Sequence, residues 1–250
     1  MDTIKELRKQ CLEISYLGQD GNLQSTFSAL DIMWTLYDKI LKDDDKFILS
    51  KGQASLGLYA VLAEKGIISK DELKSFCKLN SRFGMQIDRT KFNEEFMISA
   101  GSLGHGFPMA IGIAMANKIK KSTAKVYVLV GDGELNEGTM WESIILACHK
   151  KLDNLCLIID DNNSLGKMIN IDNLGEILIR FGFFVNTVDG HNQKDMYNAL
   201  TTHTIDQPLV VIAKTQRGYG SKTMMEDNSW FHRSPNKAEL NMLISEVDTF

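Results

Sequence analysis

The sequence predicts an α/β fold, a doubly wound and mostly parallel sheet with helices on both faces and a helical N-terminal part. In the second half of the chain, short β-branched apolar runs alternate with segments of helical periodicity. These runs are apolar along nearly their whole length, which is typical of parallel strands buried on both faces. The first 120 residues consist mainly of helical patterns. Because no repeat, low-complexity segment or linker divides the chain, we expect one domain over residues 1–250.

The N-terminal part contains four predicted helices. Each has apolar residues at helical spacing. Ser25, Thr26 or Ser28 is available as the N-cap of the second helix, and Ser69 with Glu72 forms a capping-box pattern before the fourth. The predicted ranges are Ile4–Leu17, Phe27–Leu41, Gln53–Ala63 and Lys70–Leu79.

The second half contains four predicted strands and the helices between them. The strands are Lys125–Val130, Asn154–Asp160, Phe183–Asp189 and Pro208–Ala213. The helices are Leu135–His149, Leu174–Phe181 and Gln193–His203. In open α/β sheets ligands bind at the carboxyl ends of the strands, so we expect the functional site there.

Composition excludes several classes of protein. The 28 basic and 32 acidic residues give a net charge of −4, which does not suit a binder of nucleic acid or of an anionic membrane. The apolar runs are far shorter than the ~20 residues that span a bilayer, and the N-terminus lacks the apolar region of a secretory signal. The four cysteines are scattered, so we expect reduced thiols and a cytoplasmic protein.

Polar residues follow two of the predicted strands. Asp132 lies in the sequence GDGELNEG directly after Val130, and Asn162 follows thirty positions later, about one β–α–β unit away. Aspartate and amide oxygens are hard ligands that suit Mg²⁺ or Ca²⁺. Gly131 and Gly133 allow backbone N–H groups to approach phosphate oxygens at a helix N-terminus. The pattern therefore predicts a site for a metal and a phosphate group.

Two other interpretations compete with this one. Gly131 and Gly133 match half of a nicotinamide-type dinucleotide fingerprint, with Asp160 as the acid that would bind ribose. However, Asn136 stands in place of the third glycine, and Glu134 would repel a pyrophosphate. A glycine-rich turn without any ligand is the second alternative, and it leaves Asp132 and the asparagines after the next strand unexplained.

The motifs together resemble the diphosphate-binding domain of transketolases. GDGELNEGTMWES, KLDNL and DDNN carry the resemblance, and LSKG at 49–52, GSLGHG at 101–106, DGH at 189–191 and WFHRSPN at 230–236 extend it over nearly the whole chain. The chain is most similar to the separate N-terminal subunits of split transketolases.

The resemblance implies thiamine diphosphate with a divalent metal, Mg²⁺ or Ca²⁺. Asp132, Asn162 and the carbonyl of Ser164 would be the metal ligands, and Glu137 would belong to a proton network that joins two cofactor sites. The cofactor reacts as a C2 carbanion, while the protein supplies orientation and electrostatics. The implied cofactor-binding residues are Gly101, Ser102, Leu103, Gly131, Asp132, Gly133, Glu134 and Asn162.

The resemblance also implies a second polypeptide. In this family a glutamate from a pyrimidine-binding domain activates the cofactor, and 250 residues leave no room for that domain. We therefore expect the partner to be a C-terminal transketolase-like subunit, with cofactor sites between the two chains in an α2β2 heterotetramer.

Several histidines of the family pattern are replaced in this chain. Asn22, Gln53, Met85 and Phe231 stand at four such positions, His232 follows one residue after the last, and His105 replaces a family glutamine. Asparagine and glutamine still form hydrogen bonds but do not exchange protons near pH 7, and methionine and phenylalanine do neither well. The candidate catalytic residues are therefore Glu137, His105, Gln53 and His232.

These replacements favour a two-carbon donor fragment without a hydroxyl group, since selectivity for hydroxyls rests on buried polar pairs. An apolar Met85 would suit a methyl group. We expect transfer of an acetyl unit from pyruvate to a keto-sugar, such as a nucleotide-linked one. One alternative is an ordinary transketolase N-terminal subunit that transfers a glycolaldehyde unit between sugar phosphates. The other is a non-catalytic subunit that binds cofactor or a partner.

Overall fold

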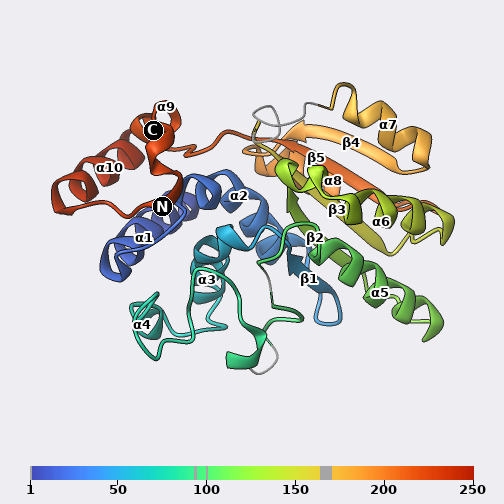
Figure 1. Cartoon of the computed structure of the whole chain (residues 1–250), viewed down its shortest axis with the longest axis horizontal. Helices are drawn as coiled ribbons and strands as arrows, with labels where there is room; N and C mark the ends of the chain where they lie inside the picture. Colours follow the sequence, from blue (N-terminus) through green and yellow to red (C-terminus); the bar gives the residue numbers. More distant parts are fainter. Residues whose placement is uncertain (1, 93–94, 100, 164–170) are drawn as a thin grey trace.

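The computed structural model describes residues 2–92, 95–99, 101–163 and 171–250, which contain one parallel five-stranded sheet (Figure 1). The strand order is β1-β2-β3-β5-β4, and every neighbouring pair is parallel. The strands are β1 (Lys46–Leu49), β2 (Val126–Gly131), β3 (Leu155–Asp161), β4 (Phe184–Asp189) and β5 (Leu209–Lys214). The predicted parallel sheet is confirmed.

Helices cover both faces of this sheet. Val128 and Leu157 belong to one buried cluster with α5 (Gly106–Ile119), α6 (Gly138–His149) and α7 (Leu174–Phe181). Their strand neighbours Leu129 and Ile158 belong to a second cluster on the opposite face. That cluster includes α1 (Thr3–Gly18), α2 (Leu23–Thr35), α3 (Ser55–Glu64) and α8 (Gln193–Leu200). Alternate strand residues thus enter two cores, which confirms the doubly wound arrangement.

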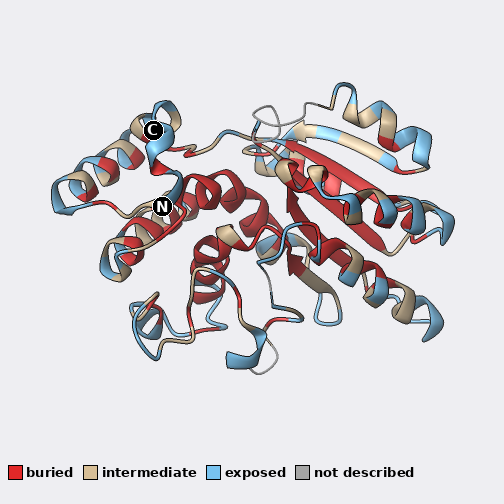
Figure 2. Ribbon diagram, in the orientation of Figure 1, coloured by how far each residue is buried: buried red, intermediate tan, exposed pale blue. Residues whose placement is uncertain are grey.

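The N-terminal helices form a layer of their own around α2. Every residue of α2 is buried, and α3 is buried along nearly its whole length (Figure 2). A helix surrounded by protein on all sides needs no polar face, which explains the weak amphipathicity of these segments. At the other end of the chain, α9 (Lys222–Glu226) and α10 (Lys237–Thr249) follow β5, and α10 packs against α1.

The structure differs from the predicted elements in several places, and α5, α9 and α10 are helices for which no range was predicted. Strand β1 was not predicted, because its four residues follow a charged turn and are too few to show a pattern. The predicted helix Lys70–Leu79 is confirmed only as α4 (Lys70–Leu73), since Cys77 has a left-handed backbone with φ of 55°. The second helix begins at Leu23 because Asn22 Oδ1 accepts the Ser25 N–H, so Ser25 is not its cap. It continues after α2 as a π-helical turn, Leu36–Ile40.

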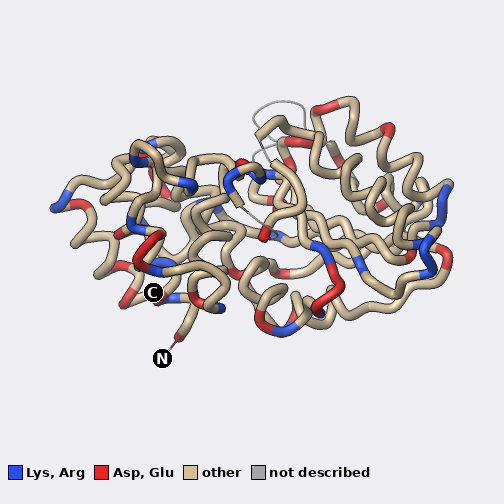
Figure 3. Tube along the Cα trace, turned by 90° about the horizontal axis from the view of Figure 1, so that it is seen from below, with Lys and Arg blue, Asp and Glu red and all other residues tan. Residues whose placement is uncertain are grey.

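Other predictions concern the surface and the thiols. Basic and acidic residues are interspersed along the trace in Figure 3. All four cysteines are free. Among the described residues, no helix combines the length and the apolar character needed to cross a membrane.

Candidate functional site

The two predicted ligand positions lie at the carboxyl ends of neighbouring strands. Gly131, the last residue of β2, is in register with Asp160 of β3. Asp132 follows β2 in a 3₁₀ turn, Asp132–Asn136, and Asn162 follows β3. Both side chains line one pocket of about 470 Å³. The expectation that the thirty-residue spacing brings them together at one sheet edge is confirmed.

The pocket gathers residues from distant parts of the chain. Eight of the predicted site residues line it, namely Gln53, Leu103, Gly131, Asp132, Gly133, Glu134, Glu137 and Asn162. Phe231, expected at a family histidine position, also lines it, and four further lining residues were not predicted, namely Ser25, Lys51, Arg217 and Asn228. Gly101, Ser102, His105 and His232 are not among the lining residues. Ser164, the predicted third metal ligand, lies outside the described residues.

A buried carboxylate organises the floor of the pocket. Asp160 is fully buried, and its Oδ2 forms an ion pair with Lys51 and accepts a hydrogen bond from Ser28 Oγ at 2.7 Å. Thr215 Oγ1 donates to the other oxygen, Oδ1. Lys51 is 1% exposed, so both charges of this pair are removed from water. Such a pair is stable only with additional hydrogen bonds, and the two hydroxyls supply them.

The same carboxylate fixes the orientation of the Asn162 amide. Asn162 Nδ2 donates inward to Asp160 Oδ2 at 3.1 Å and to Ser28 Oγ at 3.2 Å. Its Oδ1 is therefore turned the other way, where it accepts from Arg217 Nε at 3.4 Å. On the neighbouring strand, Asp132 is 1% exposed and its Oδ1 accepts the Gly133 N–H at 2.9 Å. Asp132 and Asn162 thus both carry oxygen atoms at the same pocket.

Glu134 connects the strand end to the loop around residue 104. Its carboxylate accepts hydrogen bonds from Ser50 Oγ at 2.6 Å, Gly104 N at 2.8 Å and Gly131 N at 3.1 Å. Burial raises the pKa of Glu134 above that of an ordinary glutamate, while these hydrogen bonds and the charge of Lys51 oppose the shift. The close approach requires glycine at 104, where φ is +74° and a Cβ would lie 2.7 Å from Glu137 Cβ.

Comparisons with known proteins decide the family. The family model described as the transketolase thiamine diphosphate binding domain matches residues 24–243. The chain belongs to the transketolase family. An apulose-4-phosphate transketolase subunit from Actinobacillus succinogenes is 33% identical over 91% of this chain and 87% of the relative. Ferredoxin fas2 from Rhodococcoides fascians is 36% identical over 80% of this chain and 68% of the relative.

Solved structures show the same fold. Transketolase from Leishmania mexicana superposes with a TM-score of 0.88 at 22% identity over 99% of this chain. The match spans only 42% of that transketolase chain, so this protein corresponds to less than half of it. The predicted fold class, and the resemblance to N-terminal transketolase subunits, are confirmed.

The pocket fits the cofactor that the transketolase domain binds. Carboxylate and amide oxygens suit a divalent metal, and the cations Lys51 and Arg217 suit an anionic diphosphate. A Cβ added to Gly131 would have Lys51 Cβ as its nearest described neighbour, at 3.9 Å, so it would fill pocket space. Among the described residues, no group of three or more His, Cys, Asp and Glu side chains is placed to hold a metal. A metal here would therefore need Asn162 and backbone carbonyl oxygens as ligands.

The two histidines predicted to be catalytic lie outside this pocket. His105 is exposed at the start of α5, and its Nδ1 lies 3.0 Å from Leu103 O and 3.1 Å from Ser102 Oγ. His232 is exposed at the end of the 3₁₀ turn Asn228–His232. Their catalytic roles stay predictions, since neither histidine lines the pocket.

The four residues that replace family histidines fall into two pairs. Gln53 and Phe231 line the pocket. Asn22 is buried and serves as the N-cap of α2, while Met85 packs partly buried against the N-terminal core. Met85 does not line the pocket, so the expectation that it provides a methyl-binding surface stays a prediction.

Arg217 and Phe231 form one wall of the pocket. The Arg217 guanidinium lies 5.4 Å from the centroid of the Phe231 ring. The sequence offered a signal for Arg217, which follows the end of β5 as Asp132 follows β2, and for Lys51, which stands in the LSKG motif. The resemblance at WFHRSPN assigned the loop around Phe231 to the site, but nothing in the spacing of residues 217 and 228 indicated that they reach the same pocket.

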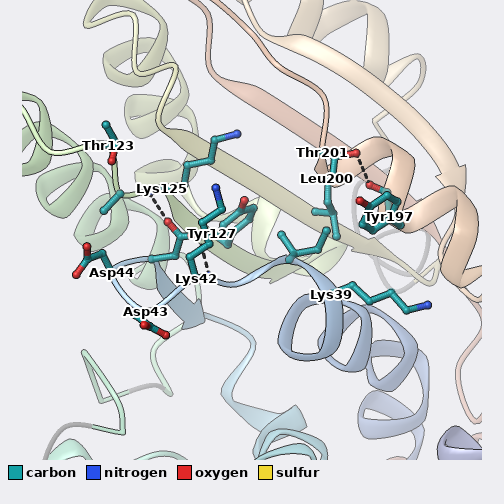
Figure 4. A pocket seen from close by; sticks show the side chains of 13 residues that line it. Lys39, Lys42, Asp43, Asp44, Thr123, Lys125, Tyr127, Tyr197, Leu200 and Thr201 are labelled. Carbon is teal, nitrogen blue, oxygen red and sulfur yellow. Dashed lines mark hydrogen bonds between the residues drawn. The ribbon is translucent and has the colours of Figure 1, made fainter.

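A second cavity lies at the opposite, amino-terminal ends of the strands (Figure 4). It measures about 560 Å³ and is lined by charged and tyrosine side chains, among them Asp43, Lys125 and Tyr197. None of the predicted site residues that the structure describes lines it.

Proposed function

We propose that this chain holds thiamine diphosphate with a divalent metal and, with a second chain, transfers a two-carbon unit. Asp132 and Asn162 Oδ1 would hold the metal, together with the predicted carbonyl ligand at Ser164. Lys51 and Arg217 would neutralise diphosphate charge in a partly buried site, where ionic hydrogen bonds are strong. When bound, thiamine diphosphate supplies the nucleophilic carbon to which the transferred unit attaches.

The second chain is proposed to be a C-terminal transketolase-like subunit. The relative from Actinobacillus succinogenes, of which this chain covers 87%, is named as one subunit of a transketolase. Glu137 is exposed and lines the pocket, which suits a group that meets a partner's residues at a shared site. We propose that this partner contributes the glutamate that activates the cofactor, in an α2β2 assembly.

One observation carries the proposed donor: among the described residues that line the pocket there is no histidine. Gln53 can form hydrogen bonds but does not exchange protons near pH 7, and Phe231 and Leu103 offer apolar surface. A donor fragment with a hydroxyl group would leave that group poorly paired beside Phe231. These residues support an acetyl unit as the donor fragment, formed from pyruvate with release of CO₂, and a keto-sugar as acceptor.

A second candidate is glycolaldehyde transfer between sugar phosphates. It is favoured by the name of the relative from Actinobacillus succinogenes, an apulose-4-phosphate transketolase subunit at 33% identity. Arg217 and Lys51 would be compatible with phosphorylated substrates as well.

Donor consumption by the reconstituted enzyme distinguishes these candidates. The chain is mixed with a C-terminal transketolase-like subunit from the same organism, thiamine diphosphate and Mg²⁺, and offered pyruvate or xylulose 5-phosphate. We expect pyruvate to be consumed, and only when both chains are present. Rapid consumption of xylulose 5-phosphate with none of pyruvate would establish the second candidate. Full activity of this chain alone would contradict the need for a partner.

A further inference from the structure

The segment that carries Arg217 is fixed by residues from four other parts of the fold. We call residues 215–220, which follow β5, the Arg217 segment. The Thr215 N–H donates to Asp161 O at 3.1 Å, and the Gly218 N–H donates to Gln24 O of α2 at 3.2 Å. From α1, Arg8 Nε donates to Tyr219 O at 2.9 Å. The fourth contact, from His191, reaches the residue directly before Arg217.

His191 joins this segment to a buried carboxylate. The Gln216 N–H donates to His191 Nε2 at 2.9 Å, and His191 Nδ1 lies 2.9 Å from Asp31 Oδ2. Because Nε2 accepts a hydrogen bond, the ring proton must be on Nδ1, where it is donated to Asp31. The His191 ring also stacks on Tyr219, with centroids 3.5 Å apart and an interplanar angle of 9°. One neutral imidazole thus makes three contacts around the segment.

The carboxylate that receives this hydrogen bond is itself anchored. Asp31 lies on α2 with a side chain 5% exposed, and it forms an ion pair with Arg8 at 2.5 Å. Arg8 is 6% exposed at its side chain, so the pair is buried between α1, α2 and the Arg217 segment. A buried, hydrogen-bonded pair of this kind resists disruption, because breaking it would leave an unpaired charge.

The segment itself has little freedom to adopt another path. Gly218 has a φ of +69°, and a Cβ at this position would lie 2.7 Å from Met224. Arg217, the residue between Gln216 and Gly218, lines the pocket and contacts Asn162 and Phe231. Its two neighbours are thus fixed by His191 and Gln24 respectively.

We infer that His191 is a positioning residue for Arg217. Asp31 anchors the His191 ring, and the ring accepts the Gln216 N–H. In this way His191 holds the Arg217 guanidinium at the diphosphate end of the pocket. The inference rests on the proposed function, in which Arg217 faces the diphosphate. It assigns a role to the DGH motif, which lies at the β4–α8 connection and does not line the pocket. The role is pre-organisation, since a cation held in place loses less conformational entropy when the anion binds.

A double-mutant cycle on this chain, reconstituted with the proposed C-terminal subunit, tests the inference. His191→Phe keeps a ring to stack on Tyr219 but removes both polar contacts. We expect the dissociation constant for thiamine diphosphate with Mg²⁺, measured by calorimetry, to rise about tenfold, which corresponds to roughly one lost charged hydrogen bond. In an Arg217→Ala background the same substitution should change the constant less than about twofold, because the group it positions is gone. His203→Phe, at a histidine outside this network, is the matched control and should bind like the wild type.

Hydrogen exchange of the ligand-free chain gives a second readout. His191→Phe should accelerate amide exchange in residues 215–220, because the Gln216 N–H loses its acceptor, while α5 and α6 keep their protection. His191→Gln carries both a donor and an acceptor and should restore part of the affinity and the protection.

Two results would overturn the inference while wild-type binding is intact. One is an equal loss of affinity from His191→Phe with and without Arg217. The other is unchanged exchange of residues 215–220 in His191→Phe. Absence of binding by the wild type would instead contradict the proposed function, and the exchange experiment would still report on the contact between His191 and the segment.

Discussion

At the scale of single residues, the pocket depends on side chains that do not face it. Asp160 binds Lys51, Ser28, Thr215 and the Asn162 amide, and so determines where the pocket has positive charge and where it has an amide oxygen. In the dinucleotide interpretation Asp160 would have bound a ribose. Its complete burial shows instead that it organises the protein interior.

Replacing Asp160 should be costly. Asp160→Asn leaves the Lys51 ammonium buried without its counter-charge, and we expect the free energy of unfolding to fall by about 3–5 kcal/mol. Asp161→Asn is the matched control, because Asp161 pairs with Lys214 at the surface and its loss should cost less than about 1 kcal/mol. Urea unfolding of both variants measures the difference. Similar losses for the two would show that Lys51 does not depend on Asp160.

Glu134 should make stability depend on pH. Its pKa is raised by burial, so its contribution to stability is fully present below the pKa of an unfolded glutamate, ~4.3, and is lost as pH rises through the raised value. Glu134→Gln removes this titration. We expect the free energy of unfolding of the wild type, relative to the variant, to decrease across that interval in urea titrations between about pH 4 and 8. Parallel curves for the two proteins would contradict the burial argument.

At the scale of elements, most of the periodic segments and the strand ends could be predicted, but the four-residue strand and the limits of the fully buried helix could not. Strand β1 has four residues, and α2 is buried on every side, so neither shows the pattern that marks an element's limits. The GDG turn and Asn162 were predictable because the parallel strand order places consecutive strand ends together. Arg217 and Asn228 were missed because their position depends on how the chain after β5 returns across the carboxyl ends of the strands, whereas Phe231 was found only through the family resemblance.

Asn22 stands at a family histidine position, and its place at the start of α2 gives it a structural role. It caps α2, so Asn22→Ala should lower the free energy of unfolding by about 1 kcal/mol, whereas Asn22→Ser retains a capping oxygen and should stay close to the wild type. Thermal unfolding checks both variants. Because Asn22 does not line the pocket, cofactor affinity should be the same in all three proteins. A change in cofactor affinity for Asn22→Ser would show instead that Asn22 contributes to the binding site.

At the scale of the whole molecule, the site exists only in the assembled fold. Its lining comes from α2, the turn after β1, the loop before α5, the ends of β2 and β3, and the segments after β5. The two buried cores on either side of the sheet fix the positions of these parts (Figure 2). The transketolase motifs and the polar groups of the pocket lie together at the carboxyl ends of β2 and β3, where Asp132 and Asn162 follow adjacent strands.

The central claim is that this edge binds thiamine diphosphate through a divalent metal. Calorimetric titration with thiamine diphosphate of this chain, reconstituted with the proposed C-terminal subunit, tests it most directly, in the presence of Mg²⁺ and again with EDTA, for the wild type and for Asp132→Ala. We predict binding by the wild type with Mg²⁺, and at least about a tenfold loss of affinity on removing either the metal or the carboxylate. Equal affinity in all four titrations, or no binding in any of them, would contradict the account.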